Sequence, residues 1–146
     1  MGGRKHNKKS GFSLVELLIT VIVIGILLTI AVPAYYNSFE KSRGQNAELN
    51  LISIYNAQKR HKLTQRTYFG CAGSVSAPGG VCTAEELQDR NHLGVYISDP
   101  YFNYGIVADD TTFTATATRI SGTLCLNAVM TVTEQGSEVN KGCALW

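Results

Sequence analysis

The sequence predicts an α+β fold in which a long N-terminal α-helix, with its apolar half protruding, packs on a small antiparallel β-sheet headpiece. Residues 17–39 carry no charged side chain and are dense in leucine, isoleucine and valine. Residues 37–66 contain no proline and remain compatible with a helix. Beyond Asp99-Pro100, apolar and polar residues alternate in short segments, which is the pattern of strands buried on one face.

The apolar run predicts a membrane helix, because about 20 apolar residues suffice to cross a bilayer. Arg4, Lys5, Lys8 and Lys9 precede it, and basic residues stay on the cytoplasmic side of a membrane. We therefore expect a single-pass helix in the inner membrane, with its N-terminus in the cytoplasm and the headpiece outside.

A conventional secretory signal is the alternative for this segment, with a small-residue cleavage site at Val32-Pro33-Ala34 that would release a secreted binding domain near Ala34. The run is longer than the usual apolar region of about 7 to 15 residues, and Glu16 lies at its head, where a charge is unfavourable in a membrane. Ser13 and Glu16 also have capping-box spacing, so local helix capping is one explanation for this glutamate.

The second half of the helix is expected to be amphipathic. Leu49, Ile52 and Tyr55 recur at near-helical spacing among polar residues, and Leu51 and Leu63 fit more loosely. One face can therefore dock on the headpiece. A single helix over residues 12–66 would be about 80 Å long at 1.5 Å per residue, which is longer than the domain itself.

A basic run follows on the same helix, formed by Lys59, Arg60, Lys62 and Arg66. We interpret it as a solvated helix end that the helix dipole favours. Lys and Arg do not cluster after Arg66, so no nucleic-acid partner is expected. His61 and His92 are interpreted as separate surface or packing side chains without a carboxylate or cysteine partner.

The cysteines lie in the second half of the chain, and none forms a CxxC pair, so two disulfides are favoured over a metal site. Four cysteines allow three pairings. Spacing favours Cys71 with Cys82 around a Gly/Ser/Pro loop, and Cys125 with Cys143. Disulfides persist in oxidising compartments, which agrees with an exported headpiece. We expect no metal and no cofactor.

The headpiece is expected to begin with a short helix. Thr83 and Glu86 have capping-box spacing, and this helix should end near Asn91 to Gly94. Strands are predicted at residues 101–108, 112–120 and 123–133, with a last short strand at 138–140. A nucleophile elbow, a phosphate loop and paired catalytic carboxylates are all missing from the sequence, so the protein is not expected to be an enzyme.

Residues 11–17, GFSLVEL, resemble the processing motif of type IV prepilins and of the related type II secretion pseudopilins. The resemblance is close from Lys8 to about Phe39 and covers only the general pilin-like plan beyond Tyr68. It implies that a prepilin peptidase cuts between Gly11 and Phe12 and methylates the Phe12 amine. The implied organisation is a removed leader (1–11), a transmembrane and assembly half of the helix (12–39), an amphipathic half (40–68) and a β-rich headpiece (69–146).

The same resemblance implies roles for three further residues of the helix. Glu16 would pair with the Phe12 amine of a neighbouring subunit and set the register of assembly. Gly25 and Pro33 would bracket a stretch that loses helical order in the fibre, and a proline inside a helix by itself predicts a kink.

The resemblance implies a structural subunit of a type IV pilus-like filament, stored in the inner membrane, polymerised through its N-terminal helix and extracellular after assembly. Its partners would be identical or related pilin subunits, the prepilin peptidase and an inner-membrane assembly platform. A type II secretion pseudopilin is the alternative. Major pseudopilins resemble calcium-binding proteins in having a C-terminal loop rich in acidic residues. In this sequence Asp109-Asp110 is the only adjacent acidic pair after Glu86, which favours the pilus. Adhesion, twitching, DNA uptake and secretion all remain open as uses of the filament.

Overall fold

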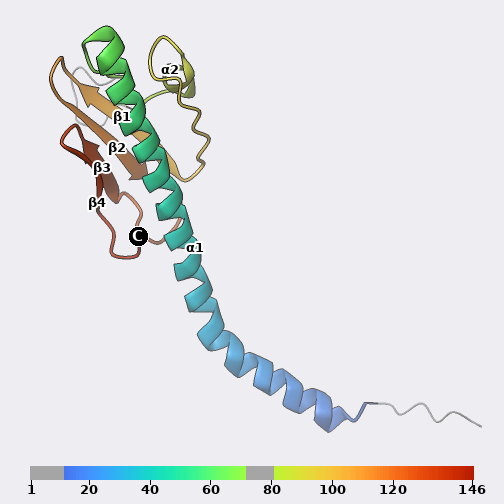
Figure 1. Cartoon of the computed structure of the whole chain (residues 1–146). Coiled ribbons are helices and arrows are strands. Elements are labelled where there is room, and N and C mark those ends of the chain that lie inside the picture. Colours follow the sequence, from blue (N-terminus) through green and yellow to red (C-terminus); the bar gives the residue numbers. More distant parts are fainter. Residues whose placement is uncertain (1–11, 72–80) are drawn as a thin grey trace, which may run out of the picture. The chain divides into compact units, whose positions relative to one another are not determined.

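The computed structural model describes residues 12–71 and 81–146. The chain divides into two units, Met1–Asn37 and Ser38–Trp146 (Figure 1). The expected leader, including Gly11, lies outside the described residues.

Helix α1 spans Leu14–Gln65 and confirms the long predicted helix. By length and composition it is the one helix among the described residues that could cross a membrane. Every residue at positions 12–39 is exposed. The hydroxyls of Thr20 and Thr29 each donate to the carbonyl three residues earlier, at 2.7 Å, so these two polar groups of the apolar run are satisfied within the helix.

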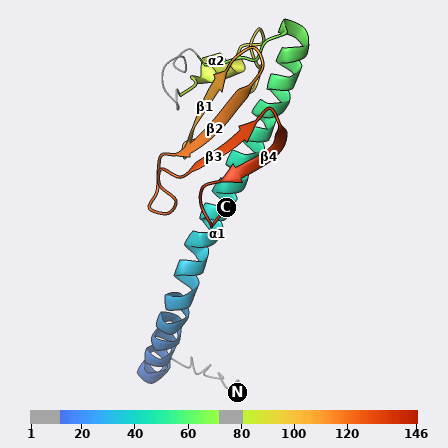
Figure 2. The ribbon, with the colours of Figure 1, turned by 90° about the vertical axis from the view of Figure 1, so that its left-hand side faces the viewer.

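The sheet is an antiparallel meander in the order β1-β2-β3-β4. Its strands are β1 (Phe102–Ala108), β2 (Phe113–Arg119), β3 (Val129–Thr133) and β4 (Gly136–Lys141). In β2 every second side chain is buried, beginning with Phe113, as its alternating sequence predicts. Figure 2 shows the sheet lying along the second half of α1, which confirms the α+β fold.

The face of α1 that packs on the sheet differs from the predicted one. Leu49 and Leu63 are exposed, and Leu51 and Ile54 supply the large buried side chains. The rest of the buried face consists of Glu40, Gly44, Ala47, Ala57 and Gln58. Leu51 was among the predicted residues and is buried, and Tyr55 is partly buried against the core, so the prediction was wrong for Leu49 and Leu63. Three of the other buried residues are small, and small residues let a helix approach a sheet closely without giving a strong hydrophobic signal.

Two element boundaries also differ from the predictions. Strand β3 begins at Val129, not at residue 123, because Cys125 and Asn127 adopt left-handed backbone angles that a strand cannot contain. The short helix α2 is Ala84–Gln88, and its Thr83–Glu86 capping box is present. It ends before Asn91 because Asp89 is extended (ψ 123°) and its carboxylate accepts the Asn91 N–H at 2.8 Å.

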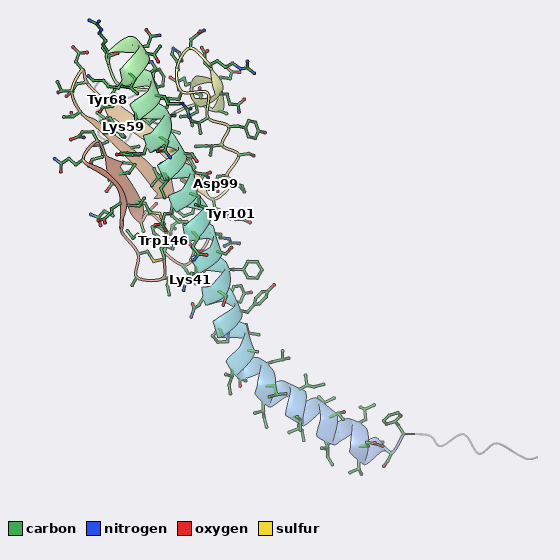
Figure 3. All side chains as sticks on the ribbon, viewed as in Figure 1. Lys41, Lys59, Tyr68, Asp99, Tyr101 and Trp146 are labelled. Carbon is green, nitrogen blue, oxygen red and sulfur yellow. A yellow bond between two sulfur atoms is a disulfide. The ribbon has the colours of Figure 1, made fainter. Side chains whose placement is uncertain are left out.

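A buried ion pair joins α1 to the end of β2. Arg119 is fully buried, and its Nε and Nη2 atoms donate to the two carboxylate oxygens of Glu40, each at 2.7 Å. Its Nη1 atom donates to the Tyr101 carbonyl at 3.2 Å. The indole Nε1 of Trp146 donates to Glu40 at 3.4 Å (Figure 3 labels Tyr101 and Trp146 beside α1). Four segments of the unit therefore meet at one carboxylate and one guanidinium.

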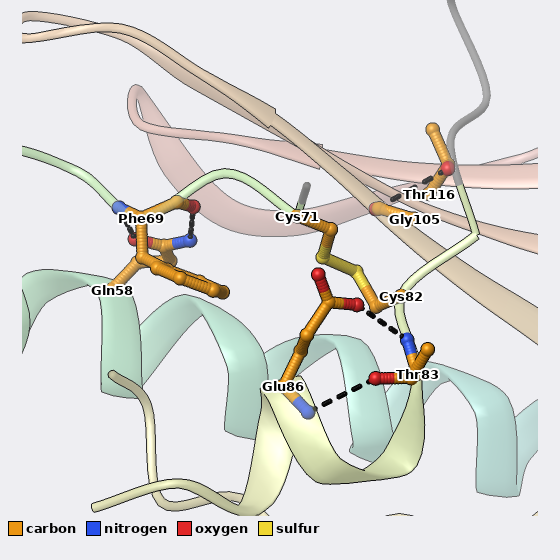
Figure 4. Close-up of a disulfide and its surroundings, with 8 residues drawn as sticks. All are labelled: Gln58, Phe69, Cys71, Cys82, Thr83, Glu86, Gly105 and Thr116. Carbon is orange, nitrogen blue, oxygen red and sulfur yellow. Dashed lines mark hydrogen bonds between the residues drawn. A yellow bond between two sulfur atoms is a disulfide. The ribbon is translucent and has the colours of Figure 1, made fainter. Parts of the chain in front are cut away.

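Two disulfides hold the ends of the headpiece. Cys71–Cys82 lies on the outer edge of β1 (Figure 4), where the two cysteine N–H groups donate to the Ile106 and Tyr104 carbonyls. These bonds cover an edge that would otherwise be open to pairing with another chain. Cys125–Cys143 ties the connection between β2 and β3 to the C-terminal segment that carries Trp146.

We predict that Arg119→Met lowers the free energy of unfolding by about 3 to 5 kcal/mol, because it leaves the Glu40 carboxylate buried without its bidentate partner. Replacing both partners, with Glu40→Leu added, should recover much of this loss. Denaturant unfolding of the full chain in detergent micelles, followed by circular dichroism, measures both values.

The matched control is Lys141→Met, which breaks the partly exposed pair with Glu48 (2.7 Å) and should cost at most about 1 kcal/mol. Equal losses for Arg119→Met and Lys141→Met would contradict the structural importance of the buried pair.

We also predict that Gly44→Ala displaces Trp146, because a Cβ at Gly44 would overlap the indole ring. Overpacking of this kind typically costs about 1 to 3 kcal/mol. Trp146 is the only tryptophan of the chain, so its emission should shift to the red. Gly25→Ala is the control, because a Cβ there meets nothing within 4 Å; unchanged emission in Gly44→Ala would refute the contact.

Candidate functional site

The first candidate site is the N-terminal end of α1. Phe12 is 83% exposed, and Glu16 lies in the first helical turn. The Ser13 carbonyl accepts the N–H groups of Glu16 (3.1 Å) and Leu17 (3.2 Å). Within the described part of the chain, the structure gives no side-chain bond between Ser13 and Glu16, whereas both halves of the Thr83–Glu86 box are made.

Gly25 and Pro33 both lie inside α1, which continues on either side of Pro33. A Cβ at Gly25 would meet no atom within 4 Å, so packing within the chain does not require a glycine there. The Pro33 nitrogen carries no hydrogen, and the turn before it therefore lacks one helical hydrogen bond.

The second candidate site is a pocket of about 420 Å³ at the C-terminal end of α1. Helix α1 supplies Arg60 and His61, and the turn after α2 supplies Arg90 and His92. Figure 1 shows α2 beside this end of α1. The remaining lining residues are Ala57, Thr64, Gln65, Asn91, Leu93 and Gly94. We call this the basic pocket.

The Phe69 ring, whose backbone is bonded to the buried Gln58 side chain, supports His92 at one side of the basic pocket. The buried Gln58 side chain bonds both backbone groups of Phe69, donating to its carbonyl at 2.5 Å and accepting its N–H at 2.9 Å (Figure 4). The His92 ring stacks on Phe69 with centroids 4.4 Å apart and planes 20° apart. The position of His92 is therefore set through Phe69 by a buried residue of α1.

The two histidines have different polar partners. The Nδ1 atom of His61 lies 2.9 Å from the Thr67 carbonyl, and because a carbonyl only accepts, Nδ1 is the protonated nitrogen. The Nδ1 atom of His92 lies 3.6 Å from an Asp89 carboxylate oxygen. Arg60 makes a weak bond to the Leu93 carbonyl at 3.4 Å.

The structure corrects the interpretation of this region. His61 and His92 line one pocket, and His92 has a carboxylate neighbour in Asp89. The sequence did not indicate that Arg90 and His92 lie near Arg60, because they are about thirty positions away along the chain. The sequence feature that could have indicated this pocket is the basic run that contains Arg60.

The side chains of the basic run do not all lie at the pocket. Lys59 donates to the Glu134 carbonyl at 2.7 Å and lies 5.2 Å from the Tyr55 ring centroid. Lys62 donates to the Asp110 carbonyl and lies 5.0 Å from the Tyr68 ring centroid. Figure 3 labels Lys59 and Tyr68 at this end of α1. Arg60 is thus the cation of the run that lines the pocket.

This arrangement suits an anion with several oxygens. A guanidinium is a planar fork of donors that remains charged and binds phosphate or carboxylate in two places. Two such groups and two imidazoles line the basic pocket, and the Asp89 carboxylate lies beside His92. Among residues 12–71 and 81–146, no group of three or more His, Cys, Asp or Glu side chains is placed to hold a metal ion.

Two further groups have shifted pKa values for structural reasons. Burial raises the pKa of the Tyr104 phenol; a hydrogen bond from Asn50 opposes this shift, and the nearby Asp99 adds to it. The backbone N–H groups of Thr112 and Thr111 lower the pKa of Asp109. Tyr104 thus stays protonated and Asp109 stays ionised at ordinary pH, and neither lines the basic pocket.

Comparison with known proteins finds two family models that match consecutive parts of the chain. A prokaryotic N-terminal methylation motif matches residues 6–32. A family described as type IV minor pilin ComP, DNA uptake sequence receptor, matches residues 33–144. The second model covers more than half of the chain, including both the sheet and the basic pocket.

Curated relatives come from both pilus and secretion systems. The type II secretion system core protein G of Aeromonas hydrophila is 26% identical over 103 residues, which are 68% of this chain and 72% of that protein. The type IV major pilin protein PilA of Myxococcus xanthus is 41% identical over 56 residues, 38% of this chain and 26% of that protein. Fimbrial protein Q of Moraxella bovis is 49% identical over 37 residues, 25% of this chain and 24% of that protein.

No solved structure matches the chain. The long helix on an antiparallel sheet, the methylation motif and the extent of the second family model agree with one another. The chain belongs to the type IV pilin-like proteins, in the family described as type IV minor pilin ComP, DNA uptake sequence receptor.

Proposed function

We propose that this protein is a structural subunit of a type IV pilus-like filament that polymerises through its N-terminal helix. The observation that carries the proposal is the complete exposure of an apolar segment, residues 12–39. An apolar surface of this length is not stable in water and must be covered by lipid or by other subunits. Lipid covers it in the inner membrane before assembly, and neighbouring helices cover it in the extracellular filament.

Processing would prepare this segment for assembly. A prepilin peptidase would remove residues 1–11 by cutting after Gly11 and would methylate Phe12, on the cytoplasmic side of a single-pass anchor. The match of the N-terminal methylation motif supports this step. Helix α1 begins at Leu14, so the new amine would stand immediately before the first helical turn. An inner-membrane platform would then add the processed subunit to related subunits.

Glu16 would guide that addition. Its carboxylate lies in the first turn of α1 and among apolar residues. An unpaired charge in an apolar filament core is costly. The positive Phe12 amine of a neighbouring subunit is the partner that removes this cost, and the pairing would set the register between helices.

Gly25 and Pro33 would allow the helix to open locally in the filament. Glycine lowers helix stability by about 1 kcal/mol relative to alanine, and Pro33 removes one backbone bond. Since a Cβ at Gly25 would meet no atom of the described residues within 4 Å, the glycine is available for such a role.

A type II secretion pseudopilin is supported by the relatives named core protein G. One contact of the headpiece favours the pilus. The Asp109 carboxylate, half of the adjacent acidic pair, accepts the N–H groups of Thr111 and Thr112 at 2.6 Å each. These bonds close the turn between β1 and β2. The carboxylate therefore has a structural role in the turn, which does not require the calcium ion that an acidic pseudopilin loop would bind.

We further propose that the filament subunit binds DNA through the basic pocket. The family description supports DNA as the ligand, and Arg60 and Arg90 supply cations that can contact phosphates. This proposal departs from the sequence-based expectation of no nucleic-acid partner. That expectation sought a cluster of Lys and Arg along the chain, whereas these two arginines come together only in the fold.

To test assembly, we predict that Glu16→Gln is inserted and cleaved normally but yields few filaments, because the Phe12 amine loses its anionic partner. Glutamine can replace glutamate in a capping box, so a capping role would leave assembly intact. Filaments are sheared from cells and quantified, and intact mass verifies that the mutant begins at methylated Phe12.

Two outcomes would count against this function. Normal filament yield from the cleaved Glu16→Gln protein would remove the assembly role of the carboxylate. A mature native protein that begins at Tyr35 would show conventional signal cleavage and would leave no helix for polymerisation.

To test DNA binding, we predict that Arg60→Gln and Arg90→Gln each weaken duplex binding to a similar extent for all sequences. Each lost phosphate contact should also reduce the slope of log affinity against log salt by about one. Fluorescence anisotropy with the mature chain in detergent micelles, over a range of salt concentrations, measures both quantities.

The matched control is Lys41→Gln. Lys41 is an exposed cation of the same helix (Figure 3), about 28 Å from Arg60 at 1.5 Å per residue. Its loss should leave affinity nearly unchanged. Wild-type affinity in the double variant Arg60→Gln/Arg90→Gln would place DNA binding outside the basic pocket, and no measurable binding by the wild type would exclude it.

A further inference from the structure

We propose that protonation of His61 and His92 controls the affinity of the basic pocket for the DNA backbone, so that the protein binds DNA more tightly at acidic pH. The inference rests on the proposed DNA-binding function of this pocket. It concerns how the same site responds to acidity.

His61 carries the first part of the argument. Its Nδ1–H is used by the Thr67 carbonyl, 2.9 Å away, so the neutral ring leaves Nε2 as an acceptor with a free electron pair. A phosphate oxygen near that atom is repelled. Protonation puts a hydrogen on Nε2 without disturbing the bond to Thr67, and the repulsive contact becomes a charge-assisted hydrogen bond.

His92 acts mainly through its acidic neighbour. Its ring is fixed by stacking on Phe69, and its Nδ1 atom lies 3.6 Å from the Asp89 carboxylate. While His92 is neutral, the negative charge of Asp89 opposes an incoming phosphate. When His92 is protonated, it offsets that charge, and Arg60 and Arg90 then act on the phosphate without this opposition.

The charged groups around the two imidazoles come from two segments. Helix α1 provides Arg60, and the turn after α2 provides Asp89 and Arg90. Lys59 and Lys62 are engaged with the Glu134 and Asp110 carbonyls. The Glu86 carboxylate accepts the Thr83 N–H at the start of α2. Protonation of both histidines therefore adds two cations to a site in which Asp89 is the nearby anion.

The mature chain is well suited to a test of this idea. The full sequence contains three histidines, and removal of the leader takes away His6. His61 and His92 would then be the only imidazoles, so a change in DNA affinity between pH 7.5 and 5.5 can be assigned to them with two substitutions.

The experiment measures the anisotropy of a rhodamine-labelled duplex of about 24 base pairs and mixed sequence at pH 5.5 and 7.5, at constant ionic strength. We expect the mature chain in detergent micelles to bind about tenfold more tightly at pH 5.5, because protonation turns the His61 contact into a charge-assisted hydrogen bond. His61→Gln/His92→Gln should lose this pH dependence, because glutamine does not take up a proton between pH 7.5 and 5.5. Lys41→Gln should keep the pH dependence.

The outcomes separate this inference from the function on which it rests. Binding of equal strength at both pH values, or an unchanged pH dependence in the double histidine variant, would overturn the inference and leave DNA binding intact. If the chain binds no duplex at pH 5.5 and none at pH 7.5, the DNA-binding function and the inference are both overturned. Circular dichroism and Trp146 emission at both pH values verify that the variants remain folded.

Discussion

The buried pair between Glu40 and Arg119 is the interaction on which the rest of the headpiece depends. It places a carboxylate of α1 against a guanidinium at the end of β2, and the same guanidinium holds the Tyr101 carbonyl just before β1. Removing two charges from water is expensive, so the pair stabilises the fold only if its geometry is nearly ideal. Both Arg119–Glu40 bonds are short and bidentate, which ties the helix to the sheet in a single register.

Two sets of contacts extend from this pair. Toward the C-terminal segment, Trp146 contacts Glu40 and lies against Gly44, and Cys125–Cys143 holds that segment to the connection between β2 and β3. Toward the far end of α1, the buried face continues to Gln58, which clamps the backbone of Phe69. The basic pocket is therefore built on the same helix face that the ion pair anchors.

The two candidate sites use different physical chemistry. The N-terminal segment offers apolar surface with one acidic side chain, so its chemistry favours lipid and copies of the same helix. The basic pocket offers paired guanidinium groups and imidazoles on a rigid aromatic support, so its chemistry favours a polyanion. A filament subunit with both surfaces can assemble through one and bind a ligand through the other, and the two functions can be changed by separate substitutions.

The sequence alone predicts the features that depend on residues close together in the chain: the long helix, the membrane-length apolar run, the alternating strand β2 and the capping box at Thr83. Each is a local pattern with a period or spacing that the folded chain keeps. Three features became apparent only in the folded protein: the buried face of α1, the burial of Arg119, and the pocket shared by Arg60, Arg90 and the two histidines. Glu40 and Arg119 are 79 positions apart, and small residues such as Gly44 and Ala47 carry little hydrophobic signal. Contacts of this kind depend on how the helix, the sheet and the connecting segments pack, and no local periodicity encodes them.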